Sequence, residues 1–109
     1  MYAVASCGDG PEAMVADRFG RAQFFAFFDE AGAFLRSVKN DSSSAAHGAG
    51  GQAVAVIASE GAKVAIGPQF GVNAESAMKA GGISAFSASG CTVSEAVSQC
   101  IAGGLKKLF

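Results

Sequence analysis

The sequence predicts a single α/β domain in which helices flank a mixed sheet of five strands. Half of the 109 residues are hydrophobic and only 16% are charged, which is the composition of a folded chain rather than of a disordered one. A chain of this length fits one compact domain, which we place over residues 1–109. Short apolar stretches first form a strand and a hairpin and then alternate with helical stretches. That order is typical of a sheet with both antiparallel and parallel pairs.

The first half of the chain supplies three of the five predicted strands. Residues 2–7 are apolar and stop at Gly-Asp-Gly-Pro, which favours a buried strand. Residues 8–21 have no clean period and contain Pro11, so we expect a loop with one short extended piece over 14–16. Two apolar runs within residues 23–39 flank Glu30-Ala31-Gly32, which predicts a hairpin.

The second half of the chain predicts alternating helices and strands. The Ala-rich stretch over 50–61 suits a helix that ends at Gly61, and residues 62–66 suit a strand. Residues 72–80 predict a second helix, and residues 83–86 predict the fifth strand. Thr92 precedes residues 93–104, and Glu95 three positions later completes a capping box, which predicts the start of a third helix.

Charge and cysteine usage disfavour several classes of protein. The net charge is −1 and the Lys and Arg residues are scattered, so no basic stripe could follow phosphates and we expect no nucleic-acid partner. No apolar run approaches the roughly 18 residues of a membrane span, so we expect no membrane association. The N-terminus has no basic leader, and the three cysteines lack a C-x-x-C pair. These features predict a cytoplasmic protein.

Three glycine-containing segments are expected at one edge of the sheet. They follow predicted strands at residues 7–10, 67–71 and 87–91, and ligands of open α/β sheets bind beyond the carboxyl ends of the parallel strands. Glycine lets backbone N–H groups approach a ligand, and the last two segments lead into helix N-termini, which favour anions. The candidate binding residues on this rim are Cys7, Gly8, Gly67, Gly71, Ser89 and Gly90.

Two cysteines and the single histidine are the candidate metal ligands. Cys7 and Cys91 lie on the predicted rim, whereas Cys100 lies inside the third helix and is interpreted as a core residue. These cysteines lack the tight C-x₂₋₄-C spacing of structural zinc sites, so we expect no closed zinc site. His47 is either an ordinary surface residue or a ligand for a transition metal. The residues alone leave both interpretations open.

An enzymatic alternative rests on three aspartates. Asp9, Asp17 and Asp29 could converge and hold two divalent ions in a metal-dependent hydrolase. Asp29, however, follows a predicted hairpin strand and is expected to cap the turn. The sequence has no spacing that supports a Ser-His-Asp or Cys-His arrangement, and it lacks the G-x-x-x-x-G-K-[ST] motif of nucleotide hydrolases. The residues alone thus give an enzymatic role little support.

Several motifs together resemble those of a known family. They are DRFGRAQFFAFFD at residues 17–29, HGAGGQAV at 47–54, GAKVAIGPQFGVNA at 61–74 and GISAFSASGCTVSEAV at 82–97. With AVAS in the first strand, they cover nearly the whole chain. On these residues the chain resembles the dinitrogenase iron–molybdenum cofactor biosynthesis family, which includes NifX, NafY and the C-terminal part of NifB. It also includes small stand-alone proteins such as the orange-protein type, which holds a molybdenum–copper sulfide cluster.

The resemblance implies a ribonuclease H-like three-layer fold and a non-catalytic role in binding, protecting or delivering metal–sulfur clusters. It also implies cofactor binding by His47, next to Gly48 and Gly50, whose lack of side chains would leave room for a large ligand. Where relatives often carry a regular glycine run, this chain has Phe70 within residues 67–71. That ring would either form an apolar wall or reduce the space for a ligand.

The leading hypothesis is therefore a carrier for an anionic iron–sulfur, iron–molybdenum–sulfur or molybdenum–copper–sulfur cluster. Arg18, Arg21 or Lys63 would balance its charge, although Arg21 could instead pair with Asp17 or Asp29. Proteins of cofactor maturation would be its partners. The first alternative is a protein-interaction module that exposes the FFAFF stretch at residues 24–28, and the second is a metal-dependent nuclease suggested by fold analogy.

Overall fold

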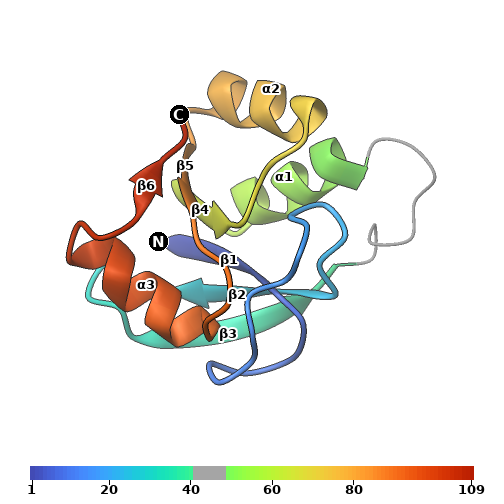
Figure 1. Cartoon of the computed structure of the whole chain (residues 1–109). Helices are drawn as coiled ribbons and strands as arrows, with labels where there is room; N and C mark the ends of the chain where they lie inside the picture. The colour runs from blue at the N-terminus through green and yellow to red at the C-terminus, as the bar shows by residue number, and fades with distance from the viewer. Residues whose placement is uncertain (41–48) are drawn as a thin grey trace.

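The computed structural model describes residues 1–40 and 49–109, and it confirms the predicted α/β class (Figure 1). Within these residues one sheet has the strand order β3-β2-β1-β4-β5-β6. Its strands are β1 (Tyr2–Ser6), β2 (Phe24–Phe28), β3 (Phe34–Lys39), β4 (Val64–Gly67), β5 (Ser84–Ser87) and β6 (Lys106–Lys107). Strands β1, β4 and β5 are mutually parallel, and the β2–β3 hairpin lies antiparallel beside β1, as predicted.

The expected three layers are also present. Helices α1 (Ala49–Ser59) and α2 (Val72–Gly81) cover one face of the sheet, and α3 (Val93–Ile101) covers the other (Figure 1). Alternate residues of β1 show the division, since Ala3 and Ala5 pack under α1 and α2 whereas Val4 packs under α3. This is the arrangement that the ribonuclease H-like prediction implied.

The FFAFF strand is buried on both faces. Phe25 and Phe27 belong to the core under α1 and α2, and Ala26 and Phe28 belong to the core under α3. These four residues are at most 1% exposed. The apolar stretch is therefore a central strand and not an exposed patch.

Local signals place most element ends within two residues, and the first helix ends at Ser59 rather than at Gly61. The capping box of α3 is confirmed, because the Glu95 N–H donates to Thr92 Oγ1 (3.1 Å) and the Thr92 N–H donates to Glu95 Oε1 (2.9 Å). Gly82, after α2, adopts the left-handed conformation with φ 71°. The short extended piece over 14–16 is confirmed by isolated bridges that Val15 forms with Ser6 and Met14 forms with Thr92.

The prediction of five strands is wrong by one. A sixth strand, β6, pairs antiparallel with β5 through Lys106 and Lys107. Two exposed lysines carry no apolar alternation, so the pattern that reveals the other strands is missing here. The third helix is also shorter than predicted, because it ends at Ile101 and Gly103 is left-handed with φ 80°.

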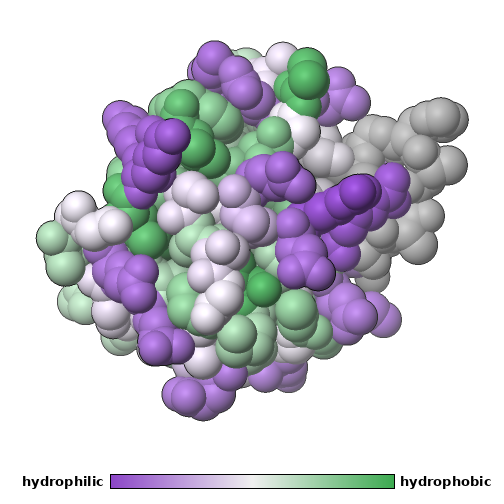
Figure 2. Space-filling view, viewed as in Figure 1, coloured by the Kyte–Doolittle hydropathy of each residue, from purple (hydrophilic) through white to green (hydrophobic). Residues whose placement is uncertain are grey.

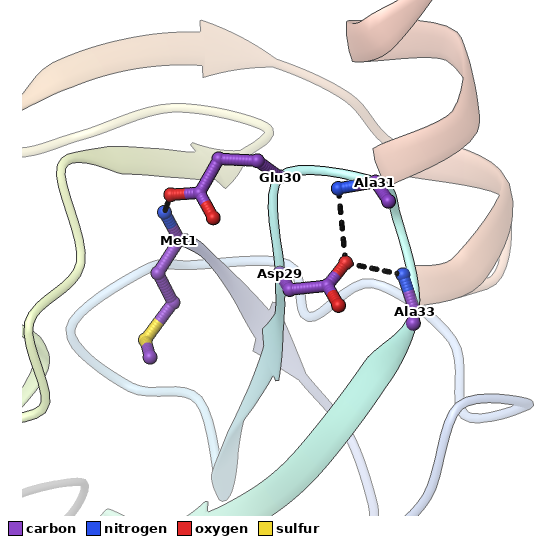
Figure 3. A network of polar contacts seen from close by, with 5 residues as sticks. All are labelled: Met1, Asp29, Glu30, Ala31 and Ala33. Atoms are coloured by element: carbon purple, nitrogen blue, oxygen red, sulfur yellow. Dashed lines mark hydrogen bonds and ion pairs between the residues drawn. The ribbon is translucent and has the colours of Figure 1, made fainter.

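The hairpin turn is closed by Asp29, as predicted. Its Oδ1 atom accepts hydrogen bonds from the N–H groups of Ala31 and Ala33, both at 2.9 Å (Figure 3). The neighbouring Glu30 carboxylate pairs with the amino group of Met1 (Figure 3). This end of β2 is thus held by its own turn.

Among the described residues, none of the helices combines the length and the apolar character that crossing a bilayer requires.

Candidate functional site

The carboxyl ends of β1, β4 and β5 meet at one edge of the sheet, but the chain leaves them toward different faces. After β4 it enters α2, and after β5 it enters α3 on the opposite face (Figure 1). The third predicted rim segment begins beside the second, where Ser87 Oγ donates to the Pro68 carbonyl (3.2 Å) and the Ala88 N–H donates to the Gly67 carbonyl (3.0 Å), and then runs toward the opposite face. It packs against residues 11–15, where the Val15 N–H donates to the Cys91 carbonyl (2.9 Å) and the Val93 N–H donates to the Ala13 carbonyl (2.8 Å).

Two cavities lie beside the first and second rim segments and share Arg18 and Arg21. The larger, called here the main cavity, has a volume of about 480 Å³. It is lined by Arg18, Phe19, Gly20, Arg21, Gly50, Gln69, Phe70, Gly71, Val72, Asn73 and Ala74. The smaller, called the thiol cavity, has a volume of about 420 Å³ and is lined by Cys7, Ala16, Asp17, Arg18, Arg21, Ala22 and Gln23.

One wall of the main cavity is aromatic. The Phe70 ring lies 4.8 Å from the ring of Phe19, which is 1% exposed, and Phe19 lies 5.1 Å from Phe25 in the core. The Phe109 ring meets Phe70 edge-on at 6.0 Å. Gly67 lies beneath this wall, since a Cβ there would be 3.7 Å from the Phe70 ring. Of the two alternatives for Phe70, the structure shows the apolar wall.

The start of α2 also lines the main cavity. Gly71 is the N-cap residue and has no side chain to accept a hydrogen bond from the first turn. The first helical bond runs from the Glu75 N–H to the Gly71 carbonyl, so the N–H groups of residues 72–74 lack acceptors within the helix. These residues line the cavity, where the helix dipole and two guanidinium groups favour an anion.

Arg18 and Arg21 lie in the loop that precedes β2, called here the arginine loop (residues 18–23). Both arginines are exposed on the surface. Strongly hydrophilic atoms cover the region of Figure 2 where Figure 1 draws this loop. Lys63, the third predicted source of charge, precedes β4 and therefore lies at the opposite edge of the sheet.

The three cysteines occupy different surroundings. Cys7 is exposed and lines the thiol cavity. Cys91 and Cys100 are half-buried against the core under α3, and burial raises the pKa of both thiols. The Glu95 carboxylate adds to the rise in the pKa of Cys91. Both groups thus favour the protonated thiol over the thiolate that binds metals.

The predicted glycines differ in what their backbone does. Gly50 and Gly71 line the main cavity. The Gly8 N–H already donates to Ser6 Oγ (3.2 Å), and the Gly10 N–H donates to Ser37 Oγ (2.9 Å). Ser89 and Gly90 are exposed and lie outside the linings of both cavities. His47 and Gly48 lie outside the described residues, so their predicted roles stay predictions.

The three aspartates of the enzymatic alternative do not share one edge of the sheet. The antiparallel register pairs Ser6 with Phe24 and Tyr2 with Phe28. Asp9 and Asp17 therefore lie near one end of β2, and Asp29 lies beyond the other. Across residues 1–40 and 49–109, no group of three His, Cys, Asp or Glu side chains is placed to hold a metal ion.

The described residues fit a large anion better than they fit a bare metal ion. Guanidinium groups and backbone N–H groups donate hydrogen bonds to sulfide, and the aromatic wall suits a large, weakly hydrated ligand. Sequence reasoning named Arg21, Arg18, Gly50, Gly71 and Phe70 but missed Phe19, Gln69 and Asn73. The signal for these was their position inside the DRFGR and GPQFGVN motifs.

Comparisons with known proteins agree with this fold. The family model described as dinitrogenase iron-molybdenum cofactor matches residues 1–103. The apo form of the orange protein from Desulfovibrio gigas is 36% identical with a TM-score of 0.91, and the match covers 97% of this chain and 90% of that one. A Thermotoga protein described as NifB-like is 35% identical with a TM-score of 0.85, covering 98% and 91%.

A more distant structure supports the fold alone. It is a dinitrogenase-type protein from Methanocaldococcus jannaschii that is 16% identical with a TM-score of 0.69, covering 98% of this chain and 92% of that one. No curated protein gives a significant sequence match.

Proposed function

Because this chain belongs to the dinitrogenase iron-molybdenum cofactor family, we propose that it is a non-catalytic carrier for an anionic metal–sulfur cluster held in the main cavity. The cluster is cargo, of the iron–sulfur, iron–molybdenum–sulfur or molybdenum–copper–sulfur type. It is exchanged with proteins of cofactor maturation in the cytoplasm.

One observation supports this proposal above the others. A cavity of about 480 Å³ combines two arginines, the uncapped start of α2 and a wall of Phe19 and Phe70. In this cavity, a cluster whose surface sulfides share a delocalised negative charge would meet both hydrogen-bond donors and an apolar surface. Guanidinium groups suit such an ion because they are weakly hydrated and hold donors in a fixed plane.

His47 completes the proposed site as a metal ligand, with Cys7 of the adjoining thiol cavity as a further candidate. Cys91 is a weaker candidate because burial favours its protonated form. Coordination by one imidazole leaves the other metal positions to sulfide, as a carrier that must release its cargo requires. His47→Ala is expected to weaken cluster retention without changing the far-UV circular dichroism spectrum.

The alternatives receive less support. The protein-interaction module required exposed phenylalanines at residues 24–28, and four of these five residues are buried. The nuclease required three converging aspartates, and Asp29 instead closes the hairpin turn at the far end of β2.

The arginines provide the direct test. Tetrathiomolybdate, a small dianionic molybdenum sulfide, would be titrated anaerobically into the wild-type protein and into Arg21→Gln, with absorbance as the readout. We expect Arg21→Gln to weaken binding about tenfold, the loss of one charge-assisted hydrogen bond. Binding by the wild type should also weaken with added salt.

Arg36→Gln is the matched control. Arg36 lies on β3, where its Nε donates to the Glu60 carboxylate (2.8 Å) and its guanidinium lies over the Phe27 ring, away from both cavity linings. The Arg36→Gln variant thus loses the same positive charge as Arg21→Gln, but away from the main cavity. Equal weakening in Arg21→Gln and Arg36→Gln would reduce the effect to net charge and contradict a site in the main cavity.

A further inference from the structure

Asn40 is an unusual residue in the described part of the chain because its polar side chain is buried. It is 1% exposed, and the only other buried polar residue described is Ser6. Asn40 directly follows β3, the edge strand of the hairpin. A buried amide costs free energy unless its donors and acceptors are satisfied, so its partners indicate what it does.

Three of the partners of Asn40 are backbone carbonyls of the arginine loop. Asn40 Nδ2 donates to the Ala22 carbonyl (2.8 Å) and to the Gly20 carbonyl (3.3 Å), and the Asn40 N–H donates to the Gln23 carbonyl (2.9 Å). The two side-chain bonds thus reach the residues immediately before and after Arg21. One amide group thus holds both peptide neighbours of Arg21, one of the two arginines that line both cavities.

The rest of the loop is fixed by packing. Phe19 and Ala22 are each 1% exposed, and the Ala22 N–H donates to the Phe19 carbonyl (3.4 Å). Phe19 is held in the aromatic wall by Phe25 and Phe70. Arg18 and Arg21 therefore extend from backbone that is held on either side, and less conformational freedom is lost when they bind an anion.

The chemistry of this position favours an amide over other side chains of its size. Two carbonyl acceptors require two N–H donors on one atom, which Asn supplies and Asp does not. An aspartate there would place carboxylate oxygens against carbonyl oxygens. Asn40→Asp thus removes both donors with almost no change in volume.

We propose that Asn40 is a positioning residue that holds the arginine loop in its anion-binding conformation, so that Arg21 is placed at the boundary of the two cavities. This inference deepens the proposed function and rests on it for its binding test. Asn40 would thus affect ligand affinity although it lies far in the sequence from the start of α2.

The binding test combines two substitutions in a cycle. Tetrathiomolybdate affinity would be measured for wild type, Asn40→Ser, Arg21→Gln and the double variant. Asn40→Ser retains one hydroxyl donor on a shorter side chain. It is measured together with Asn40→Asp, so that a variant remains if the aspartate carboxylate prevents folding. We expect Asn40→Ser to weaken tetrathiomolybdate binding about tenfold, the usual effect of removing a residue that supports a ligand-binding side chain. We expect the double variant to bind only slightly more weakly than Arg21→Gln alone. Additive losses would contradict an action through Arg21.

Val97→Ala controls for general destabilisation. Val97 is 1% exposed in the core under α3, on the opposite face of the sheet, so its truncation lowers stability without touching the loop. At a temperature where both variants are folded by circular dichroism, Val97→Ala should bind like wild type. If it loses as much affinity as Asn40→Ser, the positioning role is contradicted.

A measurement without ligand separates this inference from the proposed function. In ¹⁵N relaxation experiments the order parameter of the Arg21 amide should be that of rigid backbone, about 0.85, and should fall toward about 0.6 in Asn40→Ser. Amides of α3 should not change. Unchanged loop order parameters would overturn the role of Asn40. Failure of the wild type to bind tetrathiomolybdate would instead count against the proposed function and leave the relaxation result to decide on Asn40.

Discussion

At the scale of single residues, the chemistry of the site depends on which side chains reach solvent. Cys7 is exposed in the thiol cavity, whereas Cys91 and Cys100 pack partly into the core under α3. Burial disfavours the thiolate, so it raises the pKa of both core-side thiols. Among the residues that the structure describes, Cys7 is thus both the exposed thiol and the one that lines the thiol cavity.

We predict that Cys7 reacts first with a thiol reagent. At pH 8, iodoacetamide should modify Cys7 at least about tenfold faster than Cys91 or Cys100, because the thiolate is the reactive form and the other two thiols favour the neutral one. Peptide mass spectrometry over time measures the three rates. In urea the three rates should converge. Faster modification of Cys91 than of Cys7 would contradict the described burial.

Residue-level prediction from sequence succeeded where a residue type has one main use. Asp29 at a hairpin turn and Thr92 before a helix were interpreted correctly because local chemistry decides them. Cys100, expected in the core, is half-buried against it. Ser89 and Gly90 were expected on the binding rim, but the described cavities do not include them. Local pattern could not reveal this, because it depends on which face of the sheet the next helix covers.

At the scale of elements, the site depends on a close contact between α1 and α2. A Cβ atom added at Gly50 would lie 3.2 Å from both the Cβ and the backbone nitrogen of Ala74. Both residues line the main cavity. The absence of a side chain at Gly50 therefore lets the first turns of two helices meet beside the arginines.

We predict opposite effects for alanine at two adjacent glycines of α1. Gly51→Ala meets nothing within 4 Å, so it should raise the free energy of unfolding by up to about 1 kcal/mol through helix propensity. Gly50→Ala should lower it by roughly 1 to 3 kcal/mol through overpacking against Ala74. Urea denaturation measures both. Equal stabilisation by the two substitutions would contradict the close contact.

The capping box of α3 gives a pH-dependent prediction. The hydrogen bond from the Thr92 N–H lowers the pKa of the Glu95 carboxyl below its ordinary value of 4.5. The folded state therefore binds this proton less readily than the unfolded state. The hydrogen bond therefore contributes its full stabilisation above about pH 4.5. This contribution is lost as the pH falls through the lower pKa that Glu95 has in the folded state.

Glu95→Gln keeps an acceptor for the Thr92 N–H but cannot titrate. The variant should lose less stability than wild type between about pH 5 and pH 3 in urea denaturation series. Glu12→Gln, an exposed acid outside the capping box, serves as the control. A Glu95→Gln profile parallel to that of wild type over this range would show that the carboxylate adds no acid-sensitive stability.

At the scale of the whole molecule, the strand order assembles the site. Placing β1 between β2 and β4 brings the arginine loop, which precedes β2, beside the segment that follows β4. The element order and the hairpin followed from hydrophobic pattern and turn residues, so the fold class could be predicted. The edge strand β6 could not, because two exposed lysines pair through backbone alone.

The candidate site was predicted only in part, because it also depends on how distant segments of the chain come together. Sequence located glycine-containing segments at a sheet edge, and the structure groups Cys7, Gly50, Gly71 and Arg21 around two adjoining cavities. The aromatic wall of Phe19 and Phe70 and the clamp from Asn40 join residues that are far apart in the chain. No local pattern encodes such contacts.

The measurement that tests the carrier proposal most directly is metal analysis of protein purified anaerobically from its native host, with a visible absorption spectrum. We predict stoichiometric iron, or molybdenum with or without copper, together with sulfide-to-metal charge-transfer bands that are lost on release of the cluster. Colourless, metal-free protein that also fails to take up a reconstituted cluster would contradict the proposal.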